Sequence, residues 1–360
     1  MQRKSLIIPI AQKPKLLFLT LFMATMPMPI VGQAAELPPE VPLWPKGPPY
    51  KVTSHKKEQL RSYAARPGSP SGLNRVYSQV SRATYSLHRP RHPNGVGLVI
   101  CPGGGFRDVW IDREGHDFAL WLKPYGITCL VLKYHTRTAE DVRSKEAWRN
   151  YLQAVRADGW QAIRLLRSRA AELGLDPHKI GICGFSAGGH LALSCALHME
   201  PKPAEGQPSG MPDFAGLFYP GIPDEAEQLL ARRLTSNPSA RPICPMFIIN
   251  TRSDKLTPAS RCVDFYAHLL EAGVNAELHV FGKGTHGFDL GVGRGKSVAL
   301  WPQLFVAWLE DLGVMKEPKV EAAAYRHHVQ RGENTRNQTT NSSAWNSDRS
   351  RKRQRFNNGR

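Results

Sequence analysis

The sequence lacks several patterns that would place it in a common class of protein. Its six cysteines form no CxxC pair and no spacing typical of a metal site, which excludes a zinc finger or a disulfide-stapled scaffold. We expect them to be buried thiols, and one disulfide stays open if the compartment is oxidising. No internal repeat is visible, and no segment after the N-terminal region approaches a transmembrane length. With 360 residues, the chain can bury a large core without such staples.

The N-terminal region has the pattern of a secretory signal peptide. Basic residues precede the apolar stretch Leu16–Met26, and small residues follow at positions 32–34. An uncleaved membrane anchor is the alternative, although the apolar stretch is too short to span a bilayer. The pattern predicts a secreted or periplasmic protein, with no membrane span after cleavage.

The net charge of +18 would suggest a nucleic-acid partner, but part of the excess lies at the two ends of the chain. Residues 1–35 contribute +4 and residues 317–360 contribute +6, so +8 is spread over the 281 residues between them. The C-terminal tail is polar and almost free of aliphatic residues, so we expect it to be disordered. Its RSRKRQR run could bind an anionic surface, but a solvated basic tail is the simpler interpretation. We expect no specific nucleic-acid partner.

The middle of the chain alternates apolar runs of strand type with helical patterns, which predicts a mostly parallel central sheet with helices on both faces. In such sheets, ligands bind beyond the carboxyl ends of the strands. The predicted strands are Val96–Cys101, Ile127–Lys133, Lys179–Gly184, Phe214–Tyr219, Met246–Asn250 and Ala276–Phe281, and the predicted helices are Tyr151–Leu173, Ala187–His198, Ser260–Ala272 and Val298–Leu312.

A serine follows the third predicted strand in the stretch GFSAGG, Gly184–Gly189. In a nucleophile elbow, the residues around the serine must be nearly free of side chains, because the turn from strand to helix is very tight. Ser186 is therefore the candidate nucleophile, and the N–H of Ala187 is a candidate donor to a developing oxyanion. G-x-S-x-G also arises by chance in a glycine-rich chain. Whether Ser186 is a nucleophile therefore depends on the residues that follow the other predicted strands.

Three glycines follow the first predicted strand, in the stretch PGGGF. The N–H groups of Gly104 and Gly105 could serve as oxyanion donors, because a backbone without side chains can approach a substrate closely. A phosphate-binding loop is disfavoured, since no Gly-Lys-Ser/Thr follows and the G-x-G-x-x-G spacing is absent. A simple tight turn is the remaining alternative.

Two further strand ends carry an acid and a histidine. Asp254 follows the strand at Met246–Asn250 and could orient a histidine, although it could also be an ordinary loop aspartate. His286 lies in a glycine-flanked loop after the last predicted strand. We expect His190, His198 and His268 to lie on helices without a catalytic role, and His116 to have either a supporting role or a helix-capping one. The chain order Ser, Asp, His is the order of an α/β-hydrolase triad.

These motifs together resemble the α/β-hydrolase superfamily, and in particular the secreted bacterial acetylesterases and acetylxylan-esterase-like proteins. The resemblance covers roughly residues 75–312. The motifs that carry it are Pro102–Phe106, Glu114–Asp117, Gly184–His190, Asp254 with Pro258, Ala276–His279 and Gly282–Phe288. Relatives of this kind are sometimes labelled xylanases.

The resemblance implies an α/β-hydrolase fold and a division of the chain into a signal peptide (residues 1–34), a proline-rich N-terminal extension (35–74), the hydrolase domain (75–315) and a basic tail (316–360). The extension is expected to lead into the domain without forming an element of it. The chain departs from the related motifs twice. Pro102 stands where the lipase-type HGGG motif has histidine, and Asp254 is a single acid where relatives often have two adjacent ones.

The resemblance implies that Ser186 is the nucleophile, His286 the general base and Asp254 its orienter, with Gly104, Gly105 and Ala187 as oxyanion donors. The expected function is hydrolysis of short acyl esters, on carbohydrate in particular, through an acyl-enzyme that needs no metal and no cofactor. The alternatives are a general aryl or lipid esterase, an exopeptidase of the prolyl-oligopeptidase type, and a binding scaffold with a vestigial triad. The exopeptidases usually add a β-propeller, for which we expect no room before the first predicted strand. A glycosidase is disfavoured, because no carboxylate pair accompanies the strand ends.

Overall fold

The computed structural model describes residues 36–52, 57–235 and 242–315. The predicted signal peptide (1–34) and basic tail (316–360) lie outside the described residues. The described strands are β1 (Val41–Pro42), β2 (Gln59–Ser62), β3 (Arg75–Ser78), β4 (Thr84–His88), β5 (Gly95–Cys101), β6 (Asp108–Val109), β7 (Thr128–Lys133), β8 (Leu175–Phe185), β9 (Ala215–Phe218), β10 (Met246–Thr251) and β11 (Ala276–Phe281). The described helices are α1 (Asp117–Leu122), α2 (Lys145–Ser168), α3 (Ala170–Leu173), α4 (Ala187–Leu197), α5 (Ala226–Thr235), α6 (Ala259–Glu271) and α7 (Trp301–Asp311), and single helical turns cover Asp112–His116, Lys123–Tyr125, Glu140–Val142 and Val298–Leu300.

The central sheet has eight strands in the order β1-β4-β7-β5-β8-β9-β10-β11. The six strands from β7 to β11 in this order run parallel to one another, and β4 and β1 are added antiparallel at one edge. These six strands are the predicted ones, so the prediction of a mostly parallel sheet is confirmed. Strands β2, β3 and β6 form a separate antiparallel sheet.

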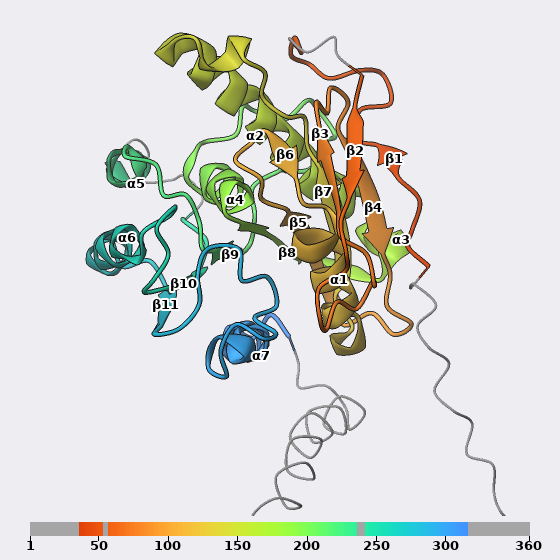
Figure 1. Cartoon of the computed structure of the whole chain (residues 1–360). Coiled ribbons are helices and arrows are strands. Elements are labelled where there is room, and N and C mark those ends of the chain that lie inside the picture. The colour runs from red at the N-terminus through yellow and green to blue at the C-terminus, as the bar shows by residue number, and fades with distance from the viewer. Residues whose placement is uncertain (1–35, 53–56, 236–241, 316–360) are drawn as a thin grey trace, which may run out of the picture. The chain divides into compact units, whose positions relative to one another are not determined.

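Helices cover both faces of the central sheet, as Figure 1 shows. Helices α2, α4, α5 and α6 follow one another across one face, while α1 and α7 lie on the other. Because both faces are covered, strands such as β7 and β10 are buried at every position, which explains why they appear in the sequence as continuous apolar runs.

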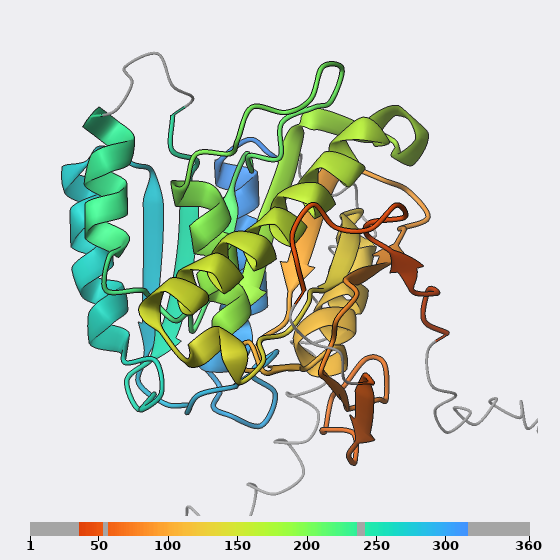
Figure 2. The same cartoon turned by 90° about the horizontal axis from the view of Figure 1, so that it is seen from above.

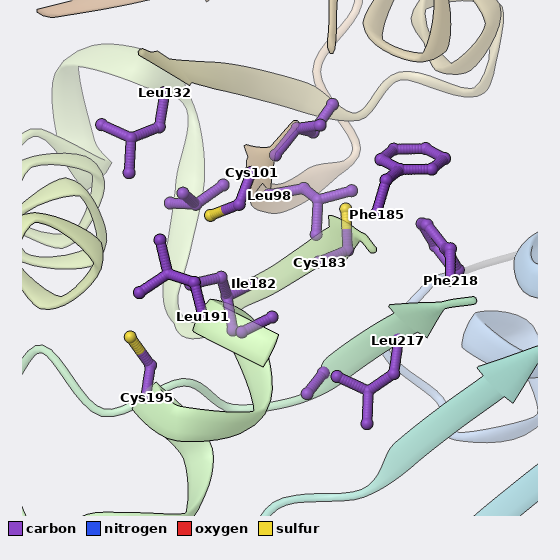
Figure 3. Packing of buried hydrophobic residues seen from close by; sticks show 14 of the residues in the cluster. Leu98, Cys101, Leu132, Ile182, Cys183, Phe185, Leu191, Cys195, Leu217 and Phe218 are labelled. Carbon is purple, nitrogen blue, oxygen red and sulfur yellow. The ribbon is translucent and has the colours of Figure 1, made fainter. Parts of the chain in front are cut away.

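Side chains of β8 alternate between the two faces and form the centre of the core (Figure 3). Ile182 points toward Leu191 of α4, whereas Phe185 points the other way toward Phe218. The ring of Phe218 lies 4.5 Å from that of Trp301 at the start of α7, measured between centroids. This packing fixes the end of β8, from which Ser186 follows directly.

Several elements differ from the sequence expectations. Helix α2 begins at Lys145, where the Ser144 hydroxyl caps it by accepting the N–H of Ala147 at 3.0 Å, and the helix is interrupted at Arg169. The proline-rich segment was expected to form no element, yet Val41–Pro42 pairs with β4 and Leu43 is fully buried. A strand of two residues is too short to show an alternating pattern. Pro42 is tolerated in it because an edge strand need not donate a hydrogen bond on its outer side.

Candidate active site

Ser186 lies on a tight turn between β8 and α4. Its backbone has a φ of 54° and a ψ of −116°, which is strained for a residue with a side chain. The neighbouring glycines permit this turn: a Cβ on Gly184 would lie 2.1 Å from the carbonyl oxygen of Gly188, and a Cβ on Gly188 would lie 1.9 Å from that of Cys101. The spacing of glycines around Ser186 therefore has a steric cause, and the chance origin of the motif is disfavoured.

The structure brings Ser186, His286 and Asp254 together from three different strand ends. His286 Nε2 lies 2.8 Å from Ser186 Oγ, and His286 Nδ1 lies 2.8 Å from Asp254 Oδ2. The Asp254 side chain is fully buried, whereas the imidazole is partly exposed. With the Nδ1 proton donated toward the carboxylate, Nε2 is free to accept a proton from the Ser186 hydroxyl.

Asp254 is held as a carboxylate by several donors. Oδ1 accepts the backbone N–H groups of Leu256 and Thr257, both at 2.9 Å, and Oδ2 accepts the Thr257 hydroxyl at 2.9 Å. Burial opposes ionisation, but the hydrogen bonds from His286 and Thr257 outweigh it and hold the pKa of Asp254 below its usual value. The acid therefore stays charged at neutral pH.

The glycine loop after β5 lies against Ser186. A Cβ on Gly103 would lie 2.9 Å from Ser186 Cβ, and the N–H of Gly103 is donated to Glu114 Oε2 at 2.8 Å. By contrast, no hydrogen bond within the described part of the chain uses the N–H of Gly104, Gly105 or Ala187 as a donor. These three N–H groups remain the candidate oxyanion donors.

Sequence reasoning missed the contacts that connect this loop to the histidine. The buried Glu114 accepts the Tyr219 hydroxyl at 3.0 Å on its second oxygen. The Tyr219 ring lies 5.2 Å from the imidazole of His286, and its carbonyl oxygen lies 3.1 Å from the Thr257 hydroxyl oxygen. The EGHD motif pointed to Glu114 without giving it a role, whereas nothing in the sequence singles out Tyr219 or Thr257.

The backbone is unusual around the same site. Five described residues other than glycine have a positive φ, namely Gln79, Phe106, Ser186, Tyr219 and Asp289. Four of them lie at the candidate site. Phe106 is in the glycine loop, Ser186 and Tyr219 follow the ends of β8 and β9, and Asp289 is in the loop that carries His286. Strained backbone gathered at one place is typical of a functional site.

Among the described histidines, only His286 is hydrogen-bonded to Ser186 Oγ. His116 Nδ1 is 2.8 Å from His88 Nε2, and both are buried, so burial lowers the pKa of His88 to about 3 and that of His116 to about 4. His116 makes no capping hydrogen bond through its side chain, which excludes the capping interpretation. His190 packs edge-on against Phe106 at 5.4 Å, His198 contacts Ser194 at the end of α4, and His268 is exposed on α6.

The described residues hold neither a disulfide nor a metal-ligating cluster. All six cysteines are buried and unpaired, as expected for structural thiols. Within residues 36–52, 57–235 and 242–315, no group of three or more His, Cys, Asp or Glu side chains could hold a metal ion. No helix of these residues is both long and apolar enough to cross a membrane.

Several known proteins that are similar to this chain are esterases. A family model described as alpha/beta hydrolase fold matches residues 145–240. An acetylxylan esterase of Xylanibacter ruminicola is 26% identical over 264 residues, which are 68% of this chain and 51% of the relative. An endo-1,4-beta-xylanase B of Butyrivibrio fibrisolvens is 27% identical over 54% of this chain and 32% of its own length. The chain therefore spans about half of the first relative and a third of the second.

Solved structures give the same result for the fold. An acetyl ester-xyloside bifunctional hydrolase from Caldicellulosiruptor lactoaceticus superposes with a TM-score of 0.53 and 24% identity, covering 78% of this chain and all of the other. An esterase from Thermogutta terrifontis, solved with propionate bound, gives a TM-score of 0.53 and 25% identity, covering 66% of this chain and 92% of the other.

Proposed function

We propose that this chain, which has the α/β-hydrolase fold and resembles esterases of that fold, is a serine esterase that hydrolyses short acyl esters, in particular acetyl esters of carbohydrate. One observation carries the proposal: the two ring nitrogens of His286 each lie 2.8 Å from a partner, Ser186 Oγ on one side and Asp254 Oδ2 on the other. This is the arrangement that general-base activation of a serine requires.

The proposed reaction begins when Ser186 Oγ attacks the ester carbonyl while His286 Nε2 takes the hydroxyl proton. The negative charge on the carbonyl oxygen is stabilised by N–H groups of Gly104, Gly105 and Ala187. The tetrahedral intermediate collapses, the alcohol leaves with the proton from His286, and an acyl-serine remains. Water, deprotonated by His286, then releases the acid by the reverse route, and Asp254 stabilises the imidazolium in both halves.

The preference for short acyl groups is supported by the relatives and by one loop. The names of two similar proteins refer to acetyl esters, and the Thermogutta esterase was solved with propionate and with butyrate. The loop Glu200–Asp213 is polar and is bound to α2, since Arg164 pairs with Glu200 and Arg167 lies 2.7 Å from Asp213. A loop held in this way is a poor apolar lid for a fatty chain.

Glycoside hydrolysis is a weaker candidate, although one relative is named a xylanase. That reaction needs two carboxyl groups on either side of the bond. Two acids of the site are already engaged. Asp254 is hydrogen-bonded to His286 and Thr257, and Glu114 is hydrogen-bonded to Gly103 and Tyr219. The chain also covers only 32% of the xylanase.

The test is hydrolysis of an aryl ester series from acetate to octanoate, together with acetate release from acetylated xylan. We expect kcat/KM to fall from acetate to butyrate and to be negligible at octanoate. Ser186→Ala should lower kcat by roughly 10⁴-fold or more without loss of folding. Retention of a tenth of the activity would remove Ser186 from the mechanism, and a rise toward octanoate would favour a lipid esterase. Secretion or a periplasmic location remains part of the proposal and rests on residues 1–34.

A further inference from the structure

A cleft with a volume of about 1020 Å³ lies between α2, the segment 44–52 and the loop 199–207. Figure 2 shows this N-terminal segment, drawn in red, running beside α2. None of the residues proposed for catalysis lines the cleft. Its residue Tyr151 lies 5.7 Å from the ring of Phe106, which directly follows Gly105. The packing of Tyr151 against Phe106 therefore connects the cleft wall to the glycine loop.

One wall of the cleft is aromatic and fixed from behind by a buried acid. Asp158 is fully buried and accepts the indole N–H of Trp44 at 2.7 Å and the hydroxyl of Tyr50. His135 Nδ1 lies 2.6 Å from the same carboxylate. Because the polar atoms of Trp44 and Tyr50 point inward to Asp158, their partly exposed rings are held in place as an apolar surface. Rigid aromatic rings of this kind suit the apolar face of a sugar ring.

The charge of the cleft is strongly positive. The only acidic residue among its lining residues is Asp141, and one of the basic ones, Arg164, is paired with Glu200. The basic lining residues are Lys46, Lys51, Arg156, Arg164 and Lys202.

Among these basic residues, Arg156 is half-buried and forms no ion pair with a described carboxylate. Its Nη1 donates to Ser194 Oγ at 3.0 Å, and its guanidinium lies 5.5 Å from the centroid of the Trp160 ring. Its Nε is buried and has no hydrogen-bond partner, and no described acid lies within ion-pair distance. Burial lowers the pKa of Arg156. A buried cation is normally paired, so an anionic partner from outside the chain would complete this site.

We propose that the cleft binds a carbohydrate that carries a carboxylate, with a sugar ring on the wall formed by Trp44 and Tyr50 and the carboxylate at Arg156. The choice of a xylose backbone for the probe rests on the proposed function, whereas the aromatic and charge contacts do not. Binding of a polymer here would place its acylated units near the glycine loop, across Phe106.

The test is calorimetric titration of the full chain with three probes that contain no ester. They are xylotriose bearing one glucuronic acid, neutral xylotetraose, and free glucuronate. We expect the acidic oligosaccharide to bind at least tenfold more tightly than either of the others. Equal affinity for the neutral oligosaccharide would overturn the role of charge. Equal affinity for free glucuronate would overturn the assignment to an oligosaccharide.

Variants locate the site. Arg156→Gln should weaken binding of the acidic oligosaccharide at least tenfold, whereas Arg149→Gln, which removes the same charge from an exposed position of α2 outside the cleft, should not. Lys51→Gln, at an exposed lining position, is a second test in case Arg156→Gln fails to fold. We expect it to weaken binding of the acidic oligosaccharide less than Arg156→Gln does. Unchanged binding in the folded lining variants would overturn the proposal.

The outcome is independent of the outcome for the esterase. A chain that binds the acidic probe but hydrolyses no ester would contradict the proposed function and leave the cleft assignment standing. A chain that hydrolyses acetate esters but binds no probe would contradict the cleft assignment and leave the proposed function standing.

Discussion

Replacing Asp254 by asparagine tests the proposed orientation of His286 most sharply. Oδ1 of Asp254 accepts two backbone N–H groups, so the asparagine carbonyl oxygen will take this place and its NH₂ group will face His286 Nδ1. The NH₂ group donates, so Nδ1 must become an acceptor and the ring proton must move to Nε2. Nε2 lies 2.8 Å from Ser186 Oγ and would then be unable to accept the hydroxyl proton.

The expected loss in kcat is about 10⁴-fold, which corresponds to about 5.5 kcal/mol in the activation free energy. The assay is hydrolysis of an aryl acetate under saturating substrate. Asp224→Asn is the matched control, because this aspartate is exposed and the chemical change is the same. If Asp254→Asn keeps a tenth of the wild-type kcat, Asp254 does not orient the base.

The same variant has a pH-dependent effect on stability. Because the fold lowers the pKa of Asp254, its contribution to the free energy of unfolding is complete above the unfolded carboxyl pKa of about 3.9 and is lost as the pH falls through the folded pKa. The difference in unfolding free energy between wild type and Asp254→Asn should therefore be largest near neutral pH and shrink below about pH 4. Urea unfolding at a series of pH values measures this, and a difference that grows toward acid would contradict the assigned charge state.

Three further predictions concern backbone strain, steric fit and buried histidines. Ser186→Gly should be more stable to urea than Ser186→Ala by about 1 kcal/mol, because glycine relieves the strain at a φ of 54°, and both should be inactive. Gly104→Ala should fail to fold or lose all activity, since its Cβ would lie 2.1 Å from a backbone oxygen, whereas Gly105→Ala, with open space around its Cβ, should fold at a cost of about 1 kcal/mol, as thermal unfolding would reveal. Burial lowers the pKa of His88 to about 3 and that of His116 to about 4, so their stabilising contribution is complete above about pH 6.5 and is lost as the pH falls toward those values. A double variant with His88→Gln and His116→Asn should lose less stability than wild type between pH 6.5 and pH 4, by about 1.4 kcal/mol per pH unit for each histidine, and equal slopes in urea unfolding would count against this.

The parts of the fold that the sequence predicts well are those in which local pattern and tertiary environment agree. Strands such as β7 and β10 are buried on both faces, so each appears as a continuous apolar run between glycines or polar residues. The predicted α/β-hydrolase fold and the resemblance to acetylxylan-esterase-like proteins are confirmed by the comparisons. Ser186 could be identified from the sequence because its tight turn requires glycine on both sides, at Gly184 and Gly188.

The parts that could not be predicted depend on contacts between distant residues. Strands β1 and β6 have two residues each, too few for any periodicity. Tyr219 looks like the last apolar residue of a strand, and its role follows only from the hydroxyl contact with Glu114, 105 positions away. Trp44 is equally inconspicuous in a proline-rich segment, yet its indole N–H is donated to Asp158 in the middle of α2, 114 positions away.

The departure at Pro102 acquires a physical explanation from these long-range contacts. The carbonyl of Pro102 accepts the buried Tyr134 hydroxyl at 2.7 Å, and the next N–H, that of Gly103, is taken by Glu114. The start of the glycine loop is thus fixed by two side chains from other elements, so its position needs no histidine within the motif. Gly103 donates its N–H to Glu114, which agrees with our proposal that Gly104, Gly105 and Ala187 supply the donors for the substrate oxygen. Under this proposal, Glu114 positions the loop and keeps the N–H of Gly103 away from the substrate, so we expect substitution at Glu114 to lower kcat more than it raises KM.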